Sequence, residues 1–577
     1  MSSQGNSPTS AGLPAETPAE QHIFEDPVLQ ENHKNQELDV EQDAGQKNQD
    51  DGEKMQTPLG DDNKPEDKKK LGWARLLLIW IGIWFAVFLY SLDQTIVSNA
   101  IPSITADFHS TSDQGWYGSG YLLTTSAFQL FYGRIYSNFS IKYTLLIAIS
   151  IFEVGSLICG VAPNSNALIA GRAIQGVGCA GITAGAYIII GHVFPIQIRP
   201  LCISSIAMVF AVAAVLGPVV GGIFTTHLTW RWCFYINLPF GGVTIAALVF
   251  FLPSIERPEL DSVPLEEKLK KVDFLGLLLF LPTITCLLLA LQWGGSTYAW
   301  SNGRIIALFV LFGSLATVFI AFERWKGPEA TLPMHIITQR SVAAAAWNAF
   351  CNGAAFFLLI YYIPFWQQVI RNASAASSGI ALLPFILGVV IMATLVGFLV
   401  TKVGYYAPFM VLASIISPIG EGLMTTWTVD TGFSKWVGYQ ALTGLGTGMG
   451  QQQPQVAIQA VLPKADIPAG ASIVVLIQTL SGAIFITIGQ AVLQNKLVQN
   501  LKAASFSSGS VDISKISTAG VTEVRSFVPS QDLHTVLVAY NSALTRVFLV
   551  AAVMSALTIF GSLLVEWKSV KPKKQQS

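Results

Sequence analysis

Ionisable side chains inside long apolar segments are the first candidates for chemistry in this sequence. Asp93, Glu153, Arg172 and Glu421 lie within such segments, and Arg546 lies near the start of the last one. A charge in a hydrocarbon layer is costly, so residues of this kind usually mark a transport path or a proton relay. A carboxylate that faces an arginine is held ionised, and protonation breaks the pair. The residue types therefore indicate a proton switch.

Asp93 and Arg172 fit such a switch by their positions. Asp93 lies shortly before the end of the first apolar segment, and Arg172 lies shortly after the start of the fourth. At 1.5 Å per residue they are about 7.5 Å and about 6 Å deep, so the two side chains could meet. The alternatives are structural. Asp93 could fix helix packing or cap a turn, and Arg172 could bind helix-end carbonyls or lipid headgroups.

Glu153 and Glu421 are further carboxyl groups in apolar segments. Glu153 lies near the middle of the third segment, which is the most costly depth and makes it a third candidate for proton coupling. A neighbouring helix could equally hold Glu153 in its neutral form by a hydrogen bond. Glu421 lies close to a segment end, where its side chain could extend to the membrane surface.

Uncharged polar and aromatic residues predict a substrate cavity. They occur in the ninth and twelfth apolar segments and comprise Trp347, Asn348, Asn352, Tyr361, Gln451, Gln452 and Gln455. Amides and aromatic rings in a mostly uncharged cavity suit bulky amphipathic organic molecules better than small ions or sugars. Interhelical hydrogen bonds and an aromatic belt at the membrane surface are the structural alternative.

Motifs of several other function classes are absent from the sequence. There is no GxxxxGK[ST] loop, so the chain is not expected to hydrolyse ATP. The histidines lie in the N-terminal region, in connections or at segment ends, and the cysteines show no CxxC spacing. We therefore expect no metal, no cofactor and no enzymatic activity, and we interpret the cysteines as packing residues.

The elements that must position these residues are membrane helices. The 577 residues are 52% apolar and only 12% charged, with a mean hydropathy of +0.51. A helix that crosses a bilayer needs about 20 mostly apolar residues. Fourteen segments qualify: 76–98, 115–136, 144–162, 168–191, 201–224, 235–252, 274–292, 304–322, 343–364, 378–400, 407–427, 437–460, 470–492 and 544–564. The sequence therefore predicts an all-α polytopic membrane protein.

The distribution of Lys and Arg over the short connections predicts that both termini are cytoplasmic, because positive residues favour that side. In this orientation the basic residues outside are Arg231, Arg304, Arg371 and Lys435. The sequon that begins at Asn372 then lies in an outer connection, which makes Asn372 a candidate for glycosylation. An unused sequon is the alternative.

Charged connections divide the predicted membrane body into six, two and six helices, the first and last sets being the layout of parallel-repeat transporters. Residues 1–70 hold 16 acidic and 7 basic residues and predict a disordered acidic cytoplasmic tail. The other expected units are a six-helix bundle over 73–252, a linker over 253–273, two inserted helices over 274–322, a linker over 323–342, a second six-helix bundle over 343–564 and a basic tail over 565–577. Basic residues are not gathered with aromatics, so nucleic-acid binding is not expected.

Small residues form faces on two of the predicted helices. Gly217, Pro218, Gly221 and Gly222 lie in the fifth segment, and every second residue over 444–450 is glycine in the twelfth. Such spacing lets helix backbones approach closely, with or without sliding.

Five motifs in the same chain order resemble those of the 14-span drug:proton antiporters of the major facilitator superfamily. They are LDQTIVSNAIP over 92–102, GRIY over 133–136 with Lys142, RAIQGVG over 172–178, GPVVGG over 217–222 and WRWCFYINLP over 230–239. The resemblance extends over about residues 73–565 and is to fungal mycotoxin and drug efflux pumps. Two positions depart from the family pattern: Ser137-Asn138 replaces an aspartate, and Ala213 replaces the leading glycine of the antiporter motif.

This resemblance implies the major facilitator fold, with two six-helix bundles that rock about a central site. It implies export of toxic or secondary-metabolite organic compounds in exchange for protons, with Asp93 and Arg172 as the coupling residues. Proton-coupled uptake or exchange of a nutrient or metal chelate is the alternative, and a transporter-like nutrient receptor is a further one. We expect a monomer in the plasma membrane, with a vacuolar or vesicle membrane as the alternative location.

Overall fold

The computed structural model describes residues 72–109, 113–253, 263–270, 272–295, 298–327, 330–504, 506 and 528–571. The predicted acidic tail, residues 254–262 and 271 of the first linker and residues 572–577 of the predicted basic tail lie outside these residues. Within the described part the regular structure is helical, apart from two isolated bridges. The all-α prediction is therefore confirmed.

The first set of helices follows the first six predicted segments. It comprises α1 (Trp73–Phe108), α2 (Gln114–Asn138), α3 (Ile141–Gly160), α4 (Ser165–Val193), α5 (Arg199–His227), α6 (Trp232–Tyr235) and α7 (Asn237–Phe251). Local signals fix several ends: the Asn164 side chain caps α4 by accepting from a backbone amide of its first turn, and Pro200 lies in the first turn of α5.

The second set follows the last six predicted segments. It comprises α13 (Arg340–Arg371), α14 (Ala375–Ile380), α15 (Leu383–Val403), α16 (Ala407–Met424), α17 (Phe433–Gly450), α18 (Gln453–Val461), α19 (Ile467–Ala503) and α22 (Leu533–Leu564). Between the two sets lie α9 (Leu265–Lys270), α10 (Phe274–Trp293), α11 (Gly303–Lys326) and α12 (Met334–Ile337). The predicted segment 437–460 is divided into α17 and α18, and Pro454 lies in the first turn of α18, where its missing amide is tolerated.

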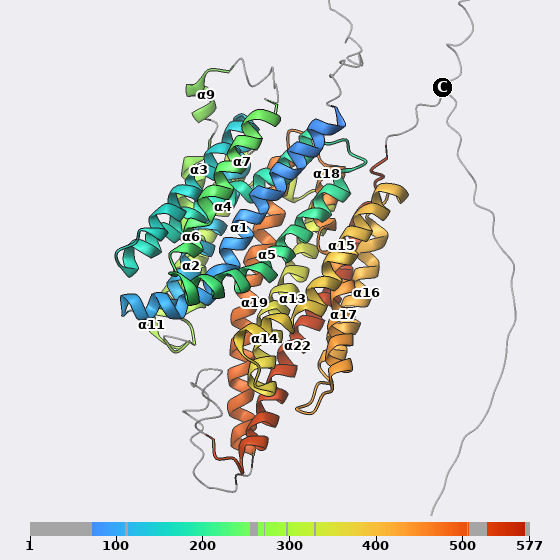
Figure 1. The fold of residues 1–577 in the computed structure, drawn as a ribbon. Helices are drawn as coiled ribbons and strands as arrows, with labels where there is room; N and C mark the ends of the chain where they lie inside the picture. The colour runs from blue at the N-terminus through green and yellow to red at the C-terminus, as the bar shows by residue number, and fades with distance from the viewer. Residues whose placement is uncertain are drawn as a thin grey trace, which may run out of the picture. The chain divides into compact units, whose positions relative to one another are not determined.

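The two sets repeat the same helix pairings. The pairs α1 with α5, α2 with α4 and α3 with α4 recur as α13 with α19, α15 with α17 and α16 with α17. The sets contact each other mainly through α2 against α19 and α5 against α15. Figure 1 shows α1 to α7 gathered on one side and α13 to α22 on the other.

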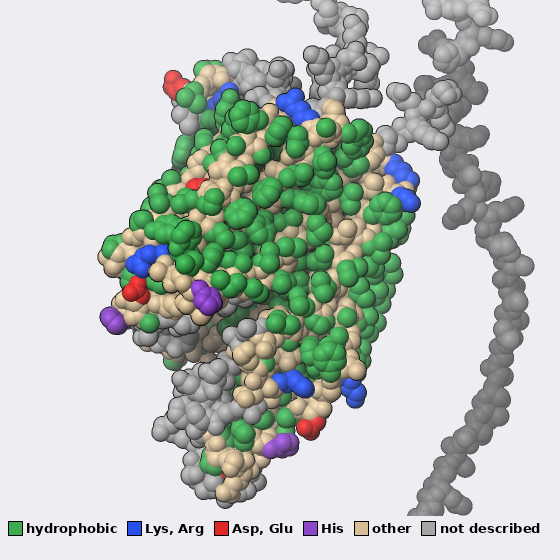
Figure 2. All heavy atoms as spheres, in the orientation of Figure 1, with side chains coloured by type: hydrophobic (Ala, Val, Ile, Leu, Met, Phe, Trp, Pro, Cys, Tyr) green, Lys and Arg blue, Asp and Glu red, His purple; other side chains and the backbone are tan. Residues whose placement is uncertain are grey.

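Twelve helices of the described part are long and apolar enough to cross a membrane. The two other predicted spans coincide with α2 and with α17 and α18, which are not among the twelve, so the count of fourteen and the orientation of the termini stay predictions. Figure 2 shows hydrophobic side chains over most of the visible face, with charged side chains mainly toward its two ends. Exposed apolar residues of this density are expected where a surface meets lipid.

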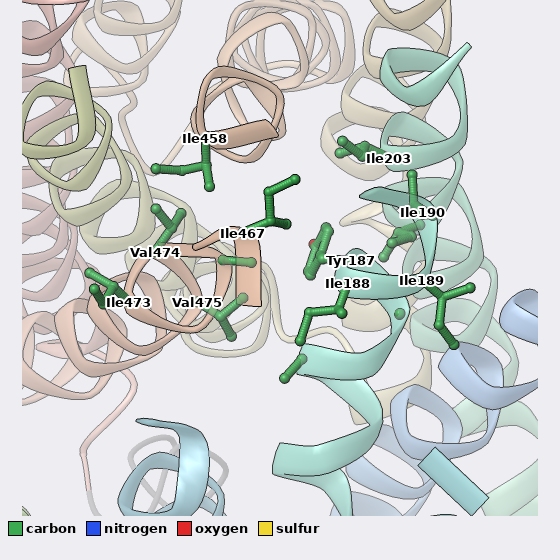
Figure 3. Packing of buried hydrophobic residues seen from close by; sticks show 14 of the residues in the cluster. Tyr187, Ile188, Ile189, Ile190, Ile203, Ile458, Ile467, Ile473, Val474 and Val475 are labelled. Atoms are coloured by element: carbon green, nitrogen blue, oxygen red, sulfur yellow. The ribbon is translucent and has the colours of Figure 1, made fainter. Parts of the chain in front are cut away.

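One end of the seam between the two sets is packed with apolar side chains, and we call it the closed end. Here Ile190 of α4 and Ile203 of α5 face Ile458 of α18 and Ile467 of α19 (Figure 3). Tyr187 on α4 lies in the same layer. In the predicted orientation this end is cytoplasmic.

Candidate functional site

Asp93 and Arg172 form a buried ion pair. Arg172 Nη1 lies 2.5 Å from Asp93 Oδ2, and both side chains are almost completely buried. The other oxygen, Asp93 Oδ1, accepts hydrogen bonds from Gln175 Nε2 at 2.9 Å and Asn237 Nδ2 at 3.0 Å. Both amide groups also donate to Ser156 Oγ, at 2.7 and 3.2 Å. Both carboxyl oxygens of Asp93 therefore face donors, one of which is cationic.

Further contacts fix the guanidinium of Arg172. Its Nε donates to the Tyr117 carbonyl at 2.8 Å and its Nη1 also donates to Gln175 Oε1 at 2.8 Å. Its Cζ lies 4.3 Å from the centre of the Tyr121 ring, a cation–π distance. Because each donor points to a different partner, the planar fork of arginine is suited to this position.

Five helices bring these groups together. Asp93 comes from α1, the Tyr117 carbonyl and Tyr121 from α2, Ser156 from α3, Arg172 and Gln175 from α4, and Asn237 from the first turn of α7. Glycines permit the close approach of α3 to α4. A Cβ at Gly155 would lie only 2.5 Å from the backbone nitrogen of Gln175. We call these residues the coupling cluster.

Glu153 lies beside the coupling cluster without joining its hydrogen bonds. It precedes Ser156 by one turn of α3 and contacts Gly241, which follows Asn237 by one turn of α7. The side chain is 9% exposed, and neither carboxyl oxygen has a hydrogen-bond partner among the described residues. The hydrogen bond considered as its structural alternative is therefore not present here.

A cavity lies between the two helix sets and adjoins the coupling cluster. Its empty volume is about 1080 Å³, counting the open solvent at its mouth. Glutamine amides and aromatic rings dominate its polar and bulky lining, with Gln94, Gln129, Gln451, Gln452, Gln478, Tyr90, Tyr121, Tyr187, Phe210, Phe356 and Phe357. Among the described residues that line it, none is Asp, Glu, Lys, Arg or His. Such a wall suits an uncharged organic molecule.

Tyr121 connects the cavity with the coupling cluster. It lines the cavity on one side, and its ring covers the Arg172 guanidinium on the other. Gln94, the residue after Asp93, also lines the cavity. A molecule in the cavity therefore lies one side chain away from the ion pair.

The structure places only two of the seven predicted cavity residues in this wall, Gln451 and Gln452. Trp347 and Tyr361 are 43% and 52% exposed and lie outside the lining. The three amides lie inside the helix packing. Asn348 donates to Ser562 Oγ at 3.0 Å, Gln455 donates to the Ala471 carbonyl at 3.1 Å, and Asn352 lies against Gly450. For Asn348 and Gln455 the contacts match the structural alternative, interhelical hydrogen bonding.

Gln452 also forms part of the boundary between the cavity and the closed end. Tyr187 Oη donates to Gln452 Oε1 at 3.2 Å, across the two helix sets. Gln459 Nε2 donates to the Tyr187 carbonyl at 2.9 Å in the same region.

Residues of the predicted antiporter motif lie where α5 crosses α1. A Cβ at Gly217 would lie 2.7 Å from Thr95 Cβ, and Thr95 Oγ1 donates to the Ala213 carbonyl of α5 at 3.1 Å. Gly221 is buried and Gly222 is partly buried, while the side chain of Pro218 lies outside the described set. The glycine face thus serves close packing next to Asp93.

Asn372 lies at the end of α13 in an exposed position. Its backbone is left-handed, with φ of 56°, and its amide caps α13 by donating to the Gln367 carbonyl. The sequon is therefore accessible, and its glycosylation stays a prediction.

Five residues of the coupling cluster were not predicted as site residues: Tyr117, Tyr121, Ser156, Gln175 and Asn237. Gln175 and Asn237 nevertheless belong to the RAIQGVG and WRWCFYINLP motifs. The same second motif supplies Trp230 and Arg231, which bind Asp107 beyond the end of the first apolar segment. The hydrogen bond from Trp230 and then that from Arg231 hold the pKa of Asp107 below its usual range.

The sequence is similar to a known family and to several known proteins. The sequence model of the Major Facilitator Superfamily matches residues 83–486. The efflux pump MFS1 of Trichophyton rubrum is 47% identical over 500 residues, which are 87% of this chain and 93% of that one. The efflux pump aflT of Aspergillus parasiticus is 47% identical over 513 residues, 89% of this chain and 99% of that one.

A solved structure supports the fold independently. The proton:xylose symporter XylE, bound to 6-bromo-6-deoxy-D-glucose, aligns with a TM-score of 0.53 at 14% identity. The alignment covers 84% of this chain and 94% of XylE. At this identity the likeness concerns the fold alone.

Proposed function

The chain belongs to the Major Facilitator Superfamily, and we propose that it exports its substrate by proton antiport through the coupling cluster. Like the efflux pumps to which it is similar, it is a multi-pass membrane protein that exports organic compounds. The observation that carries the proton step is the buried Asp93–Arg172 pair beside an uncharged cavity.

Protonation of Asp93 changes what its neighbours can do. The neutral acid no longer attracts Arg172 as an ion, so the guanidinium loses its only ion-pair partner among the described residues. A buried cation without a partner is costly, so Arg172 is expected to shift toward the Tyr121 ring or toward the side-chain oxygen of Gln175. Either shift moves Tyr121, and with it the cavity wall. Proton binding and substrate binding thereby compete through one side chain.

The state described by the structure fits substrate release to the outside. The closed end is cytoplasmic in the predicted orientation, and the Tyr187–Gln452 hydrogen bond separates the cavity from it. Substrate would therefore leave outward from this conformation, and a proton entering from the same side would reach Asp93. We place the protein in the plasma membrane as a monomer.

The cavity wall supports a substrate class. Rings such as Phe356 and Phe357 offer stacking faces, and amides such as Gln94 and Gln478 offer both donors and acceptors. A permanent cation would enter without any carboxylate in the described wall to pair with it, which is unfavourable in a dry site. We infer that neutral aromatic compounds with hydroxyl or carbonyl groups are transported in preference to cationic analogues of the same scaffold.

The test uses purified full-length protein in proteoliposomes with an acidic interior, with neutral aromatic metabolites and cationic dyes added in turn. Native protein is expected to release protons when a neutral compound is added, and Asp93→Asn is expected to abolish this release. Asp107→Asn is the matched control, because Asp107 lies on the same helix but is exposed.

Two outcomes would contradict the proposal. Equal substrate-driven proton movement in native protein and Asp93→Asn would remove Asp93 from the coupling path. Proton and substrate movement in the same direction would favour the uptake alternative over export.

A further inference from the structure

Glu421 is a second fully buried carboxyl group, in the opposite helix set from Asp93. Its Oε1 accepts hydrogen bonds from Ser555 Oγ of α22 at 2.8 Å and from Ser417 Oγ of α16 at 3.1 Å. Its Oε2 has no hydrogen-bond partner among the described residues, and the side chain is 0% exposed. The expected extension to the membrane surface is therefore wrong for this residue.

The repeated helix pairings allow the two sets to be matched position by position. In α3 and α4, Gly155 contacts Gln175 and Gly178 contacts Phe152. In α16 and α17, glycines with the same spacing make the same crossing. Gly420 contacts Thr443 and Gly446 contacts Ser417.

This match places Glu421 at the position of Ser156 and Gln440 at the position of Arg172. The layer that holds the coupling cluster in the first set thus holds a carboxyl group in the second set as well. The difference is that a neutral amide stands where the first set has its arginine.

Charged groups near Glu421 were sought on every helix that packs against α16. On α17 the ionisable side chains are Lys435 and Tyr439, on α22 they are His534, Tyr540 and Arg546, and α18 has none. Lys435, His534 and Arg546 are exposed, and among the described residues Glu421 forms no ion pair. Ionisation of a buried carboxyl without a cation is costly, whereas a proton restores neutrality.

Hydroxyl groups continue the polar contacts along the seam of α16 and α22. Thr558 Oγ1 lies 2.8 Å from Ser414 Oγ, and the Ser414 and Ser562 hydroxyl oxygens are 2.9 Å apart. Thr558 donates to the carbonyl of Ser555, whose hydroxyl binds Glu421. Hydroxyl groups can both donate and accept, so this row of hydroxyls surrounds the carboxyl group with polar neighbours between α16 and α22.

We propose that Glu421 is a second proton-binding site, neutral in this conformation and exchanging its proton during transport. Gln440, whose side-chain oxygen and nitrogen both have no partner among the described residues, is buried in the same layer and leaves Glu421 without a counter-ion. The transport role rests on the proposed function, whereas the bound proton does not.

Infrared absorption of the full-length protein in detergent tests the bound proton directly, without substrate. Native protein is expected to show the carbonyl stretch of a protonated carboxylic acid at neutral pH, with a component that both Glu421→Gln and Glu421→Ser lose. Glu421→Ser places the residue of the matching position 156 in the second set, and Glu153→Gln is the control for another buried carboxyl. A native-like band in both Glu421 variants would overturn the proposal.

Proteoliposomes then test the exchange. Because one of two sites no longer binds a proton, the number of protons released per substrate is expected to fall to about half in Glu421→Gln. An unchanged ratio in both Glu421 variants would overturn the proposal and leave antiport through Asp93 intact. If native protein released no protons with substrate, the proposed function would fail, and the infrared band would still decide whether Glu421 holds a proton.

Discussion

The carboxyl group of Asp93 is held in place by several neighbours at once. One oxygen faces the guanidinium of Arg172, and the other accepts from Gln175 and Asn237. Removal of one partner from a buried ion pair leaves an uncompensated charge, which costs more than the pair contributes. Small changes at this site should therefore have large effects on transport.

Replacement of Arg172 by lysine tests whether the charge or the fork matters. Lysine keeps the positive charge, but its ammonium cannot bind the Tyr117 carbonyl, Gln175 and Asp93 from fixed directions while covering the Tyr121 ring. We expect Arg172→Lys to lower substrate-driven proton release at least about tenfold, a loss of about 1.4 kcal/mol. The measurement is the rate of pH-gradient dissipation in proteoliposomes, with the exposed Arg304→Lys as control. Full activity in Arg172→Lys would mean that charge alone suffices.

Replacement of Tyr121 tests the link between cavity and ion pair. Tyr121→Phe keeps the ring over the guanidinium and should keep the ratio of protons to substrate. Tyr121→Leu removes the cation–π contact, worth about 1 to 2 kcal/mol when buried, and should lower that ratio. Equal ratios in the two variants would show that Tyr121 only shapes the cavity.

The pair could be predicted from the sequence because depth in a helix follows from residue number. Its amide partners could not, since rotation about the helix axis decides which side chain faces which neighbour, and glutamine and asparagine are common in connections and helices alike. The same reason explains Trp347 and Tyr361, which lie in a suitable helix but outside the cavity wall. Motif membership was the signal that pointed to Gln175 and Asn237.

At the scale of elements, a buried cluster around Asp273 joins the inserted helix α10 to the end of α11 and to the connection that follows α11. Asp273 caps α10 and accepts from Lys326 Nζ at 2.7 Å and from the Thr331 amide and hydroxyl at 3.1 and 3.0 Å. Burial alone would raise the pKa of Asp273, but the hydrogen bond from Lys326, the Gly276 amide and the Lys326 charge hold the pKa below its usual range. Ring contacts of Phe274 with Phe131 and of Trp293 with Trp116 hold α10 along α2.

Asp273→Asn is expected to destabilise this attachment. Because the folded-state pKa of Asp273 is depressed, its contribution is present above the unfolded pKa and is lost as the pH falls through the folded one. At neutral pH the variant should lose about 2 kcal/mol of stability, and the difference from native protein should shrink in acid. Thermal unfolding in detergent, followed by tryptophan fluorescence, measures both effects.

The exposed Asp430→Asn is the control for this experiment, since it removes the same charge without a buried partner. A pH-independent difference between Asp273→Asn and native protein would show that the charge of Asp273 plays no part.

Helix positions were predictable from hydropathy, whereas helix lengths were not. The first segment was expected over 76–98, but α1 continues to Phe108, and α19 runs to Ala503 rather than to 492. Hydropathy marks the part of a helix that meets lipid, and backbone hydrogen bonds continue beyond it. The break between α17 and α18 has a local cause in Pro454.

At the scale of the whole membrane body, two glycines set how closely the halves meet. A Cβ at Gly133 of α2 would lie 2.9 Å from Ser472 Cβ of α19, and a Cβ at Gly397 of α15 would lie 2.8 Å from Ser204 Cβ of α5. Both contacts join the two helix sets near the closed end. Larger residues there would keep the sets apart in this conformation.

A disulfide across this seam should arrest transport. Gly133→Cys combined with Ser472→Cys brings two Cβ atoms within about 1 Å of disulfide geometry. Oxidation is expected to lock the closed end and to stop substrate flux, and reduction is expected to restore it. Flux in proteoliposomes is the measurement.

Each single-cysteine variant serves as the control, because a disulfide with one of the native cysteines would arrest a single variant as well. Full flux in the oxidised double variant, with the cross-link confirmed by mass, would mean that this seam does not open during transport.

The cavity has an electrical consequence. No described residue of its wall carries a charge, and the proposed substrate is neutral. Substrate binding therefore leaves the net charge of the cavity unchanged. Current across the membrane would then be carried by protons alone, and each would gain about 2.3 kcal/mol per 100 mV of membrane potential. A current recorded from this protein on a planar membrane, divided by the flux of a neutral substrate, would therefore give the number of protons per transport cycle.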